Sequence, residues 1–129
     1  MRLLLDTCVL LWMAGEPSRL SLRVREHLAN PDTERYVSAI SAFEIAVKHR
    51  KKKLDLPLPP RQWFREVLAT YQIQELPITS EIAGLSQEVA VSHSDPCDRL
   101  IIATAQIHGM AVVTSDGFIQ GCEDIETIW

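Results

Sequence analysis

Hydrophobic and polar positions divide the chain into two kinds of segment. Short runs with the pattern of buried strands are separated by longer segments with apolar residues at helical spacing. The expected strands are Leu3–Leu5, Arg35–Ser38, Ile73–Ile78, Ala111–Thr114 and, as an edge strand, Ile125–Trp129. The expected helices cover Leu20–Leu28, Ser41–Lys53, Arg61–Tyr71, Thr79–Val91 and Pro96–Ile107. This alternation predicts an α/β fold, with a parallel sheet covered on both faces.

Two of the expected helices begin with a recognisable signature. Asp95 and Pro96 have the order of an N-cap and a first helical residue, and Gly109 marks the end of the same helix. Ser41 and Glu44 have the spacing of a capping box, which predicts that a helix begins there. No linker or repeat interrupts the pattern, so we expect a single domain over residues 1–129.

Composition and charge narrow the class of protein. With 47% hydrophobic and 23% charged residues, the chain is typical of a packed globular protein. Its formal net charge of −4 is unlike that of most nucleic-acid binders, so a phosphate partner needs a local basic patch or bound cations. The three widely spaced cysteines suit neither a disulfide framework nor a zinc site. No apolar stretch approaches the roughly 18 residues of a membrane span, and we expect a cytoplasmic protein.

Four acidic residues fall at the junctions of the expected strands and helices. Asp6 follows the first strand, and Asp116 follows the strand Ala111–Thr114. Glu44 and Asp98 lie in the expected first turns of two helices. Functional sites of parallel α/β sheets gather at the carboxyl ends of the strands, so we expect these acids to share one crevice.

Clustered carboxylates indicate a particular chemistry. They repel one another, and a divalent cation removes that repulsion. Oxygen ligands without histidine or cysteine favour Mg²⁺ or Mn²⁺ over zinc. Two such ions, about 4 Å apart, can stabilise the attacking and leaving oxygens of an in-line displacement. The pattern therefore predicts metal-dependent hydrolysis of phosphodiesters.

Each acid also has a purely structural interpretation. Glu44 could complete the capping box, and Asp98 could complement the dipole of its helix. Asp6 and Asp116 could be turn residues. Asp6 is the hardest to explain in this way, because a charge directly after an apolar run is costly unless it is paired.

Several other polar residues are candidates for supporting roles. Thr7 and Ser115 could orient a carboxylate or a metal-bound water, although turn hydroxyls are also common. Arg99 could meet a phosphate or form a structural ion pair. One basic run could follow an RNA backbone or simply end a helix favourably, and it contains Lys48, Arg50, Lys51, Lys52 and Lys53.

Four stretches of the chain resemble, in order, the motifs of PIN-domain proteins of the VapC toxin type. They are Leu3–Trp12, Val37–Ala46, His93–Ala103 and Val112–Asp116. The chain departs from the common pattern at Cys97, where a bulky apolar residue is usual, and at Lys51–Lys53, where glycine is frequent.

The resemblance implies a fold, an activity and partners. The fold is a three-layer α/β/α sandwich around a parallel sheet of four to five short strands. The activity is that of an endoribonuclease that cleaves tRNA or another structured RNA and inhibits translation. The partners are a VapB-like antitoxin and a second copy of the toxin, in a homodimer. The ligands of Mg²⁺ or Mn²⁺ are Asp6, Glu44, Asp98 and Asp116.

Two other functions compete with this interpretation. The first is a phosphoacceptor or phosphatase domain, which needs an aspartate that becomes phosphorylated and a supporting lysine. The second is a domain that binds RNA or a protein partner with little catalysis. An intact set of four acids favours the nuclease over the second alternative.

Overall fold

The computed structural model describes residues 1–91 and 95–129. Its strands are β1 (Arg2–Leu5), β2 (Glu34–Ser38), β3 (Ile73–Leu76), β4 (Ala111–Val113) and β5 (Thr127–Ile128). Its helices are α1 (Thr7–Gly15), α2 (Leu22–Ala29), α3 (Ala39–Arg50), α4 (Pro60–Thr70), α5 (Ser80–Leu85), α6 (Pro96–His108) and α7 (Gly117–Gln120). A short 3-10 helix, η1 (Pro17–Arg19), connects α1 to α2.

The strands form one parallel sheet in the order β3-β2-β1-β4-β5. The central strand β1 lies between β2 and β4, with Leu5 opposite Val37 on one side and Val113 on the other. Leu3, Leu4 and Leu5 are fully buried, as a strand covered on both faces requires. The predicted α/β class and parallel sheet are confirmed.

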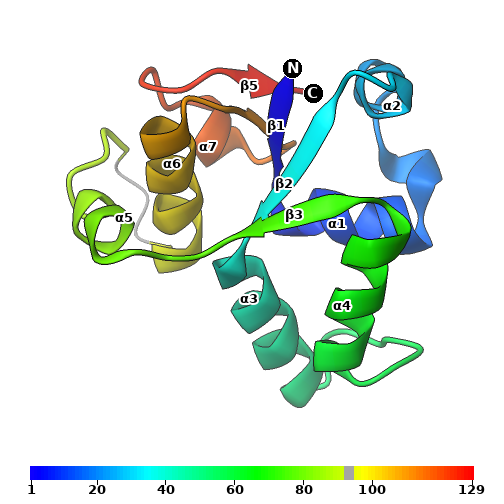
Figure 1. The fold of residues 1–129 in the computed structure, drawn as a ribbon. Helices are drawn as coiled ribbons and strands as arrows, with labels where there is room; N and C mark the ends of the chain where they lie inside the picture. Colours follow the sequence, from blue (N-terminus) through cyan, green and yellow to red (C-terminus); the bar gives the residue numbers. More distant parts are fainter. Residues whose placement is uncertain (92–94) are drawn as a thin grey trace.

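The two faces of β1 belong to different hydrophobic clusters. Leu3 and Leu5 pack in a cluster with residues of α1, α2 and α4. Leu4 points to the opposite face, into a cluster with residues of α5, α6 and α7. Helices therefore cover both faces of the sheet, as predicted, and α3 continues below the sheet next to α4 (Figure 1).

The predicted capping box at Ser41 is wrong. Helix α3 begins at Ala39, and its N-cap is Ser38, whose hydroxyl accepts a hydrogen bond from the Ile40 backbone N–H. Strand β2 ends at Ser38, so strand and helix follow each other without a loop. Glu44 consequently lies in the second turn of α3, and its side chain does not cap the helix.

The predicted bounds are right for the start and end of α6 and wrong for the end of α5. Helix α6 has the predicted start, with Asp95 as N-cap and Pro96 first, and Gly109 ends it with a φ of 63°. The predicted helix up to Val91 is wrong in length, because α5 ends at Leu85 and turns follow. Within the described residues, no helix is both long enough and apolar enough to cross a membrane.

Candidate active site

The carboxyl ends of β1 and β4 bring two of the four predicted acids to one edge of the sheet. Asp6 directly follows β1 and caps α1, and Asp116 follows β4 and caps α7. Asp98 lies in the first turn of α6, whose lower end is beside α3 in Figure 1. Glu44 approaches from α3. The four residues come from segments far apart in the sequence.

Asp6 is held from two sides. Its Oδ1 accepts a hydrogen bond of 2.7 Å from the backbone N–H of Thr7. Its Oδ2 accepts one of 2.8 Å from the hydroxyl of Thr114. Burial raises the pKa of Asp6, the two hydrogen bonds lower it, and the charges of Glu44 and Asp116 raise it again. The net pKa is above the ordinary value, so Asp6 is a buried carboxyl that sits near other negative charges.

Thr114 performs the role that we expected of Ser115. Its buried hydroxyl donates to Asp6 and accepts a hydrogen bond of 3.0 Å from the backbone N–H of Asp116. The side chain of Ser115 is exposed. The sequence does indicate this role for Thr114, because Thr114 is the polar residue that directly follows the apolar residues of the strand.

The hydroxyl of Thr7 hydrogen-bonds a carboxylate, and that carboxylate belongs to Glu44. The Thr7 hydroxyl donates to Glu44 Oε1 over 2.8 Å and lies 2.8 Å from the hydroxyl of Ser41. Ser41 is fully buried in α3. Its contact with α1 replaces the capping role predicted for it, so sequence reasoning missed Ser41 as part of the site.

Of the four predicted acids, Asp98 is the one whose pKa is raised most strongly. Its side chain is 9% exposed, and burial together with the charges of Asp95, Asp116, Asp6 and Glu44 raises its pKa to about 7. An acid that served only the helix dipole would not need this surrounding. The charges of the other three predicted acids all act on Asp98, so these acids lie near it.

Asp116 combines a structural role with its place in the site. Both side-chain hydrogen bonds that the structure records for it use Oδ1, which accepts from the backbone N–H groups of Phe118 and Ile119. The turn-residue interpretation of Asp116 is therefore correct in part. Its charge also raises the pKa of Asp6 and Asp98, so capping is not its whole effect.

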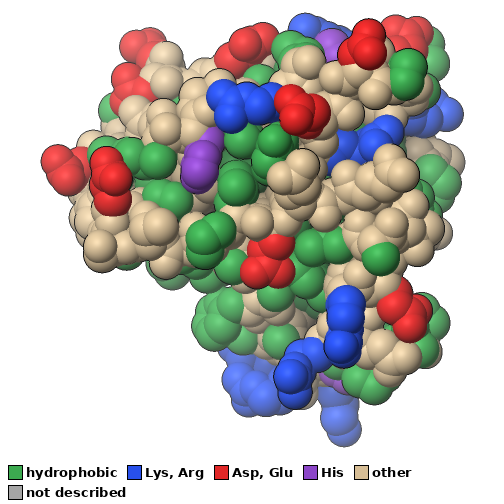
Figure 2. Space-filling model, in the orientation of Figure 1, with side chains coloured by type: hydrophobic (Ala, Val, Ile, Leu, Met, Phe, Trp, Pro, Cys, Tyr) green, Lys and Arg blue, Asp and Glu red, His purple; other side chains and the backbone are tan. Residues whose placement is uncertain are grey.

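The basic residues to which we assigned supporting roles lie in three different environments. Arg99 donates to the backbone carbonyls of Ser86 and Val91, over 2.8 and 3.0 Å, which ties α6 to the segment after α5. Lys48 pairs with Glu44, at 3.4 Å between Nζ and Oε2. The remaining cations of the basic run are exposed at the end of α3, where Figure 2 shows Lys and Arg side chains gathered at the lower end of the molecule.

The two cysteines beside the acids are neutral thiols. Burial raises the pKa of Cys8 in α1, and nearby carboxylates raise it further. Burial and the charges of Glu44, Asp95 and Asp98 raise the pKa of Cys97 to about 11. Since the thiolate is the reactive form of cysteine, neither residue is suited to nucleophilic attack.

The chemistry of these residues suits a hydrated divalent ion. The donors are carboxylate oxygens, and their mutual repulsion is the energetic reason to bind a cation. Among residues 1–91 and 95–129, no three His, Cys, Asp or Glu side chains are arranged to hold one metal directly. Mg²⁺ commonly uses one or two carboxylates and completes its shell with water and substrate phosphate. Direct ligation by all four acids remains a prediction.

Comparison with known proteins identifies the family. A family model described as PIN domain matches residues 3–119. The chain is also 35% identical over 114 residues to Ribonuclease VapC22 of Mycobacterium tuberculosis, which covers 88% of this chain and 85% of the relative. The chain belongs to the PIN-domain family. The resemblance to VapC-type PIN domains is thus confirmed by a relative that matches most of both chains.

This PIN domain also resembles solved structures in its fold. One match is VapBC2 from Rickettsia felis bound to a promoter DNA fragment, with 13% identity, a TM-score of 0.72 and 99% and 98% coverage of the two chains. Another is DNA-bound VapBC from Salmonella typhimurium, with 17% identity, a TM-score of 0.69 and 99% and 97% coverage. FitAcB from Neisseria gonorrhoeae matches with 22% identity, a TM-score of 0.65 and 98% and 96% coverage. These matches confirm the predicted α/β/α sandwich.

Proposed function

We propose that this PIN domain is a Mg²⁺- or Mn²⁺-dependent endoribonuclease. The observation that carries the proposal is the gathering of Asp6, Glu44, Asp98 and Asp116 from distant segments; at Asp98, burial and the charges of Asp95 and of the other three acids raise the pKa to about 7. Such a cluster is poorly stable as four free carboxylates and well suited to a divalent cation. The name of the relative, Ribonuclease VapC22, supports RNA as the substrate.

The protein's own residues prepare the site for this reaction. Thr7 and Thr114 fix Glu44 and Asp6 through hydroxyl donors. Fixed carboxylates lose less conformational freedom when an ion binds, which favours binding. A bound divalent ion would supply the activation of water and the stabilisation of charge at phosphorus.

The exposed cations at the end of α3 form a basic surface beyond the acids, and this surface is suited to contact RNA phosphates. Arg50 lies six residues after Glu44, which is about 9 Å along a helix at its usual rise of about 1.5 Å per residue. We infer that the RNA backbone runs along this end of α3, with its phosphates near the basic side chains. The contacts involved are those of Arg50, Lys51, Lys52 and Lys53.

The solved relatives suggest partners. They include a toxin-antitoxin complex from Klebsiella pneumoniae and a member of the VapBC family of toxin-antitoxin systems from Mycobacterium tuberculosis. We propose that this chain likewise binds a VapB-like antitoxin, forms a homodimer and, when free of antitoxin, cleaves tRNA or another structured RNA in the cytoplasm and so inhibits translation. Growth arrest on expression, relieved by the antitoxin, is the cellular outcome that this proposal requires.

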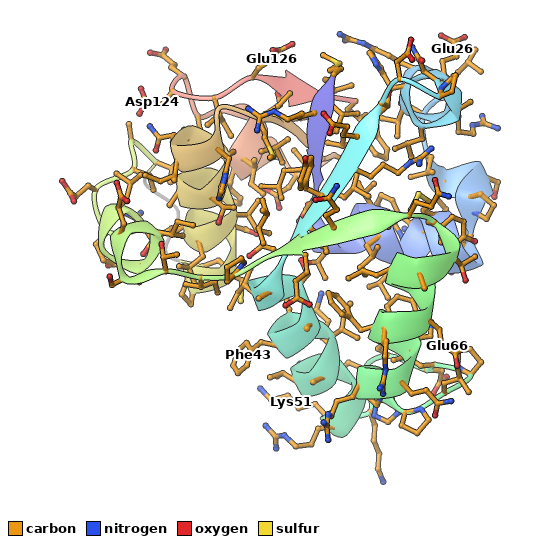
Figure 3. The ribbon with its side chains drawn as sticks, viewed as in Figure 1. Glu26, Phe43, Lys51, Glu66, Asp124 and Glu126 are labelled. Atoms are coloured by element: carbon orange, nitrogen blue, oxygen red, sulfur yellow. The ribbon has the colours of Figure 1, made fainter. Side chains whose placement is uncertain are left out.

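An RNA cleavage assay tests the activity. We expect the purified protein to cut a tRNA pool with Mg²⁺ or Mn²⁺ and to lose that activity in a chelator. Asp6→Asn should be at least a hundredfold slower, whereas Asp124→Asn, at an exposed carboxylate (Figure 3), should match the wild type. Full activity in chelator, or in Asp6→Asn, would refute the mechanism.

A second measurement addresses the alternative of a binding domain with little catalysis. Growth arrest should require Asp116 if RNA cleavage causes it. Equal arrest by the wild type and by Asp116→Ala would favour the binding alternative. For the phosphoacceptor alternative, stable modification of Asp6 by beryllofluoride would be the corresponding result.

A further inference from the structure

Glu44 is contacted on both of its carboxylate oxygens. Oε1 accepts the hydrogen bond from the Thr7 hydroxyl, and Oε2 lies 3.4 Å from the ammonium of Lys48 one helical turn later. The Glu44 side chain is 19% exposed, and that of Lys48 is 38% exposed. The ion pair therefore stands partly shielded from water, unlike the remaining cations of the basic run.

The surroundings of Lys48 are those of the acidic site. Burial lowers the pKa of its ammonium, but the charge of Glu44, its hydrogen bond with Glu44 and the charge of Asp6 raise it, and the net pKa lies above the ordinary value. Lys48 is thus charged at neutral pH. It also lowers the pKa of both Cys8 and Cys97, which lie on α1 and α6. The charge of Lys48 therefore affects groups on three helices, α1, α3 and α6.

We propose that Lys48 is the resident counter-ion of the carboxylate cluster and competes with a divalent ion for Glu44. This inference depends on the proposed function, because it assumes that the cluster binds such an ion. Without metal, the ammonium neutralises Glu44 and holds its Oε2. An ion held by that oxygen would have to displace the ammonium, and repulsion by Lys48 would lower the affinity of the site for the ion. Lys48 is in this sense a positioning residue that sets the affinity for metal.

The proposal predicts an unusual result for the loss of a single charge. Replacing Lys48 by glutamine removes both the competitor for Glu44 and the ammonium that would repel a dication held by Glu44. The site should then bind metal roughly three- to tenfold more tightly, because the repulsion between the ammonium and a dication is lost. A residue that only supported the helix would leave the affinity unchanged.

Titration calorimetry with Mn²⁺ on the full chain provides the test. Lys48→Gln should bind Mn²⁺ more tightly than the wild type, and Lys48→Arg, which retains the charge, should stay near it. Lys51→Gln is the matched control, since it removes the same charge at an exposed position at the lower end of α3 (Figure 3). Far-ultraviolet circular dichroism confirms that each variant is folded.

The possible outcomes separate this inference from the proposed function. Tighter binding in Lys48→Gln alone supports the competition. Unchanged or weaker binding in Lys48→Gln, or equal tightening in Lys51→Gln, overturns it while leaving the nuclease proposal intact. If the wild type binds Mn²⁺ no better than Asp6→Asn does, both the metal site and the competition are refuted.

Discussion

The stability of the metal-free protein should depend on the protonation of Asp98. Its pKa is 3.8 in the reference state and about 7 in the fold. The folded protein therefore holds the proton more tightly than the unfolded chain. The corresponding stabilisation is fully present below about pH 4 and is lost as the pH rises through about 7. At about 1.36 kcal/mol per pH unit, this difference in pKa corresponds to about 4 kcal/mol of unfolding free energy.

Asp98→Asn isolates this effect, because asparagine has the same shape and no charge. We expect the variant and the wild type to be about equally stable at pH 4. At pH 8 the variant should be more stable by about 3 kcal/mol, since losing a negative charge in the first turn of α6 offsets up to about 1 kcal/mol of the gain. A mutation that removes a proposed metal ligand is thus expected to stabilise the metal-free fold.

Urea denaturation in a chelator, followed by circular dichroism from about pH 4 to about pH 8.5, measures the difference. The exposed Asp124 provides the control, and Asp124→Asn should follow the wild type across the range. A difference between Asp98→Asn and wild type that does not change with pH would contradict the reasoning. So would a variant that is less stable than the wild type at pH 8.

Three further results are expected. Thr114→Val should lower the unfolding free energy by about 2–3 kcal/mol and impair RNA cleavage, because the buried carboxylate of Asp6 loses a hydrogen-bond donor. Thr104→Val is the buried control, since the Thr104 hydroxyl donates to a carbonyl of its own helix. In urea denaturation this control should cost less than about 1 kcal/mol, and it should leave cleavage intact. Millimolar Mg²⁺ should raise the melting temperature of the wild type at pH 7.5 and not that of Asp6→Asn, as calorimetry can show; an equal rise in both would place the ion elsewhere. Gly109→Ala should cost about 1 kcal/mol, because φ is 63° there, without changing Mn²⁺ affinity.

Local sequence patterns determined most of the fold. The alternation of apolar runs with helical periodicity predicted the strands that form the parallel sheet and the two helical layers. Asp95, Pro96 and Gly109 marked the ends of α6 correctly, because N-caps, first-turn proline and left-handed C-caps act within a few neighbouring residues. The positions of Asp6, Asp98 and Asp116 were visible for the same reason, whereas Glu44 lies one turn further into its helix than predicted.

The tertiary structure decided which neighbour each polar residue meets. Ser41 had the local pattern of a cap, but β2 runs directly into α3 at Ser38, and Ser41 instead contacts Thr7 across the site. The choice of Thr114 over Ser115 depends on which side chain the end of β4 turns inward. These contacts join residues from 34 to 108 positions apart, and no local pattern encodes such distances.

The raised pKa of Asp98 and the pairing of Lys48 with Glu44 depend most completely on tertiary structure. Both arise from burial and from charges on several separate elements. The sequence by itself determined that Asp6, Asp98 and Asp116 stand at the ends of strands or at the start of a helix, since local chemistry specifies those ends. How strongly the acids perturb one another depends on the packing of α3, α6 and the sheet, because electrostatic energy varies with distance and solvent exposure, which only the folded chain defines.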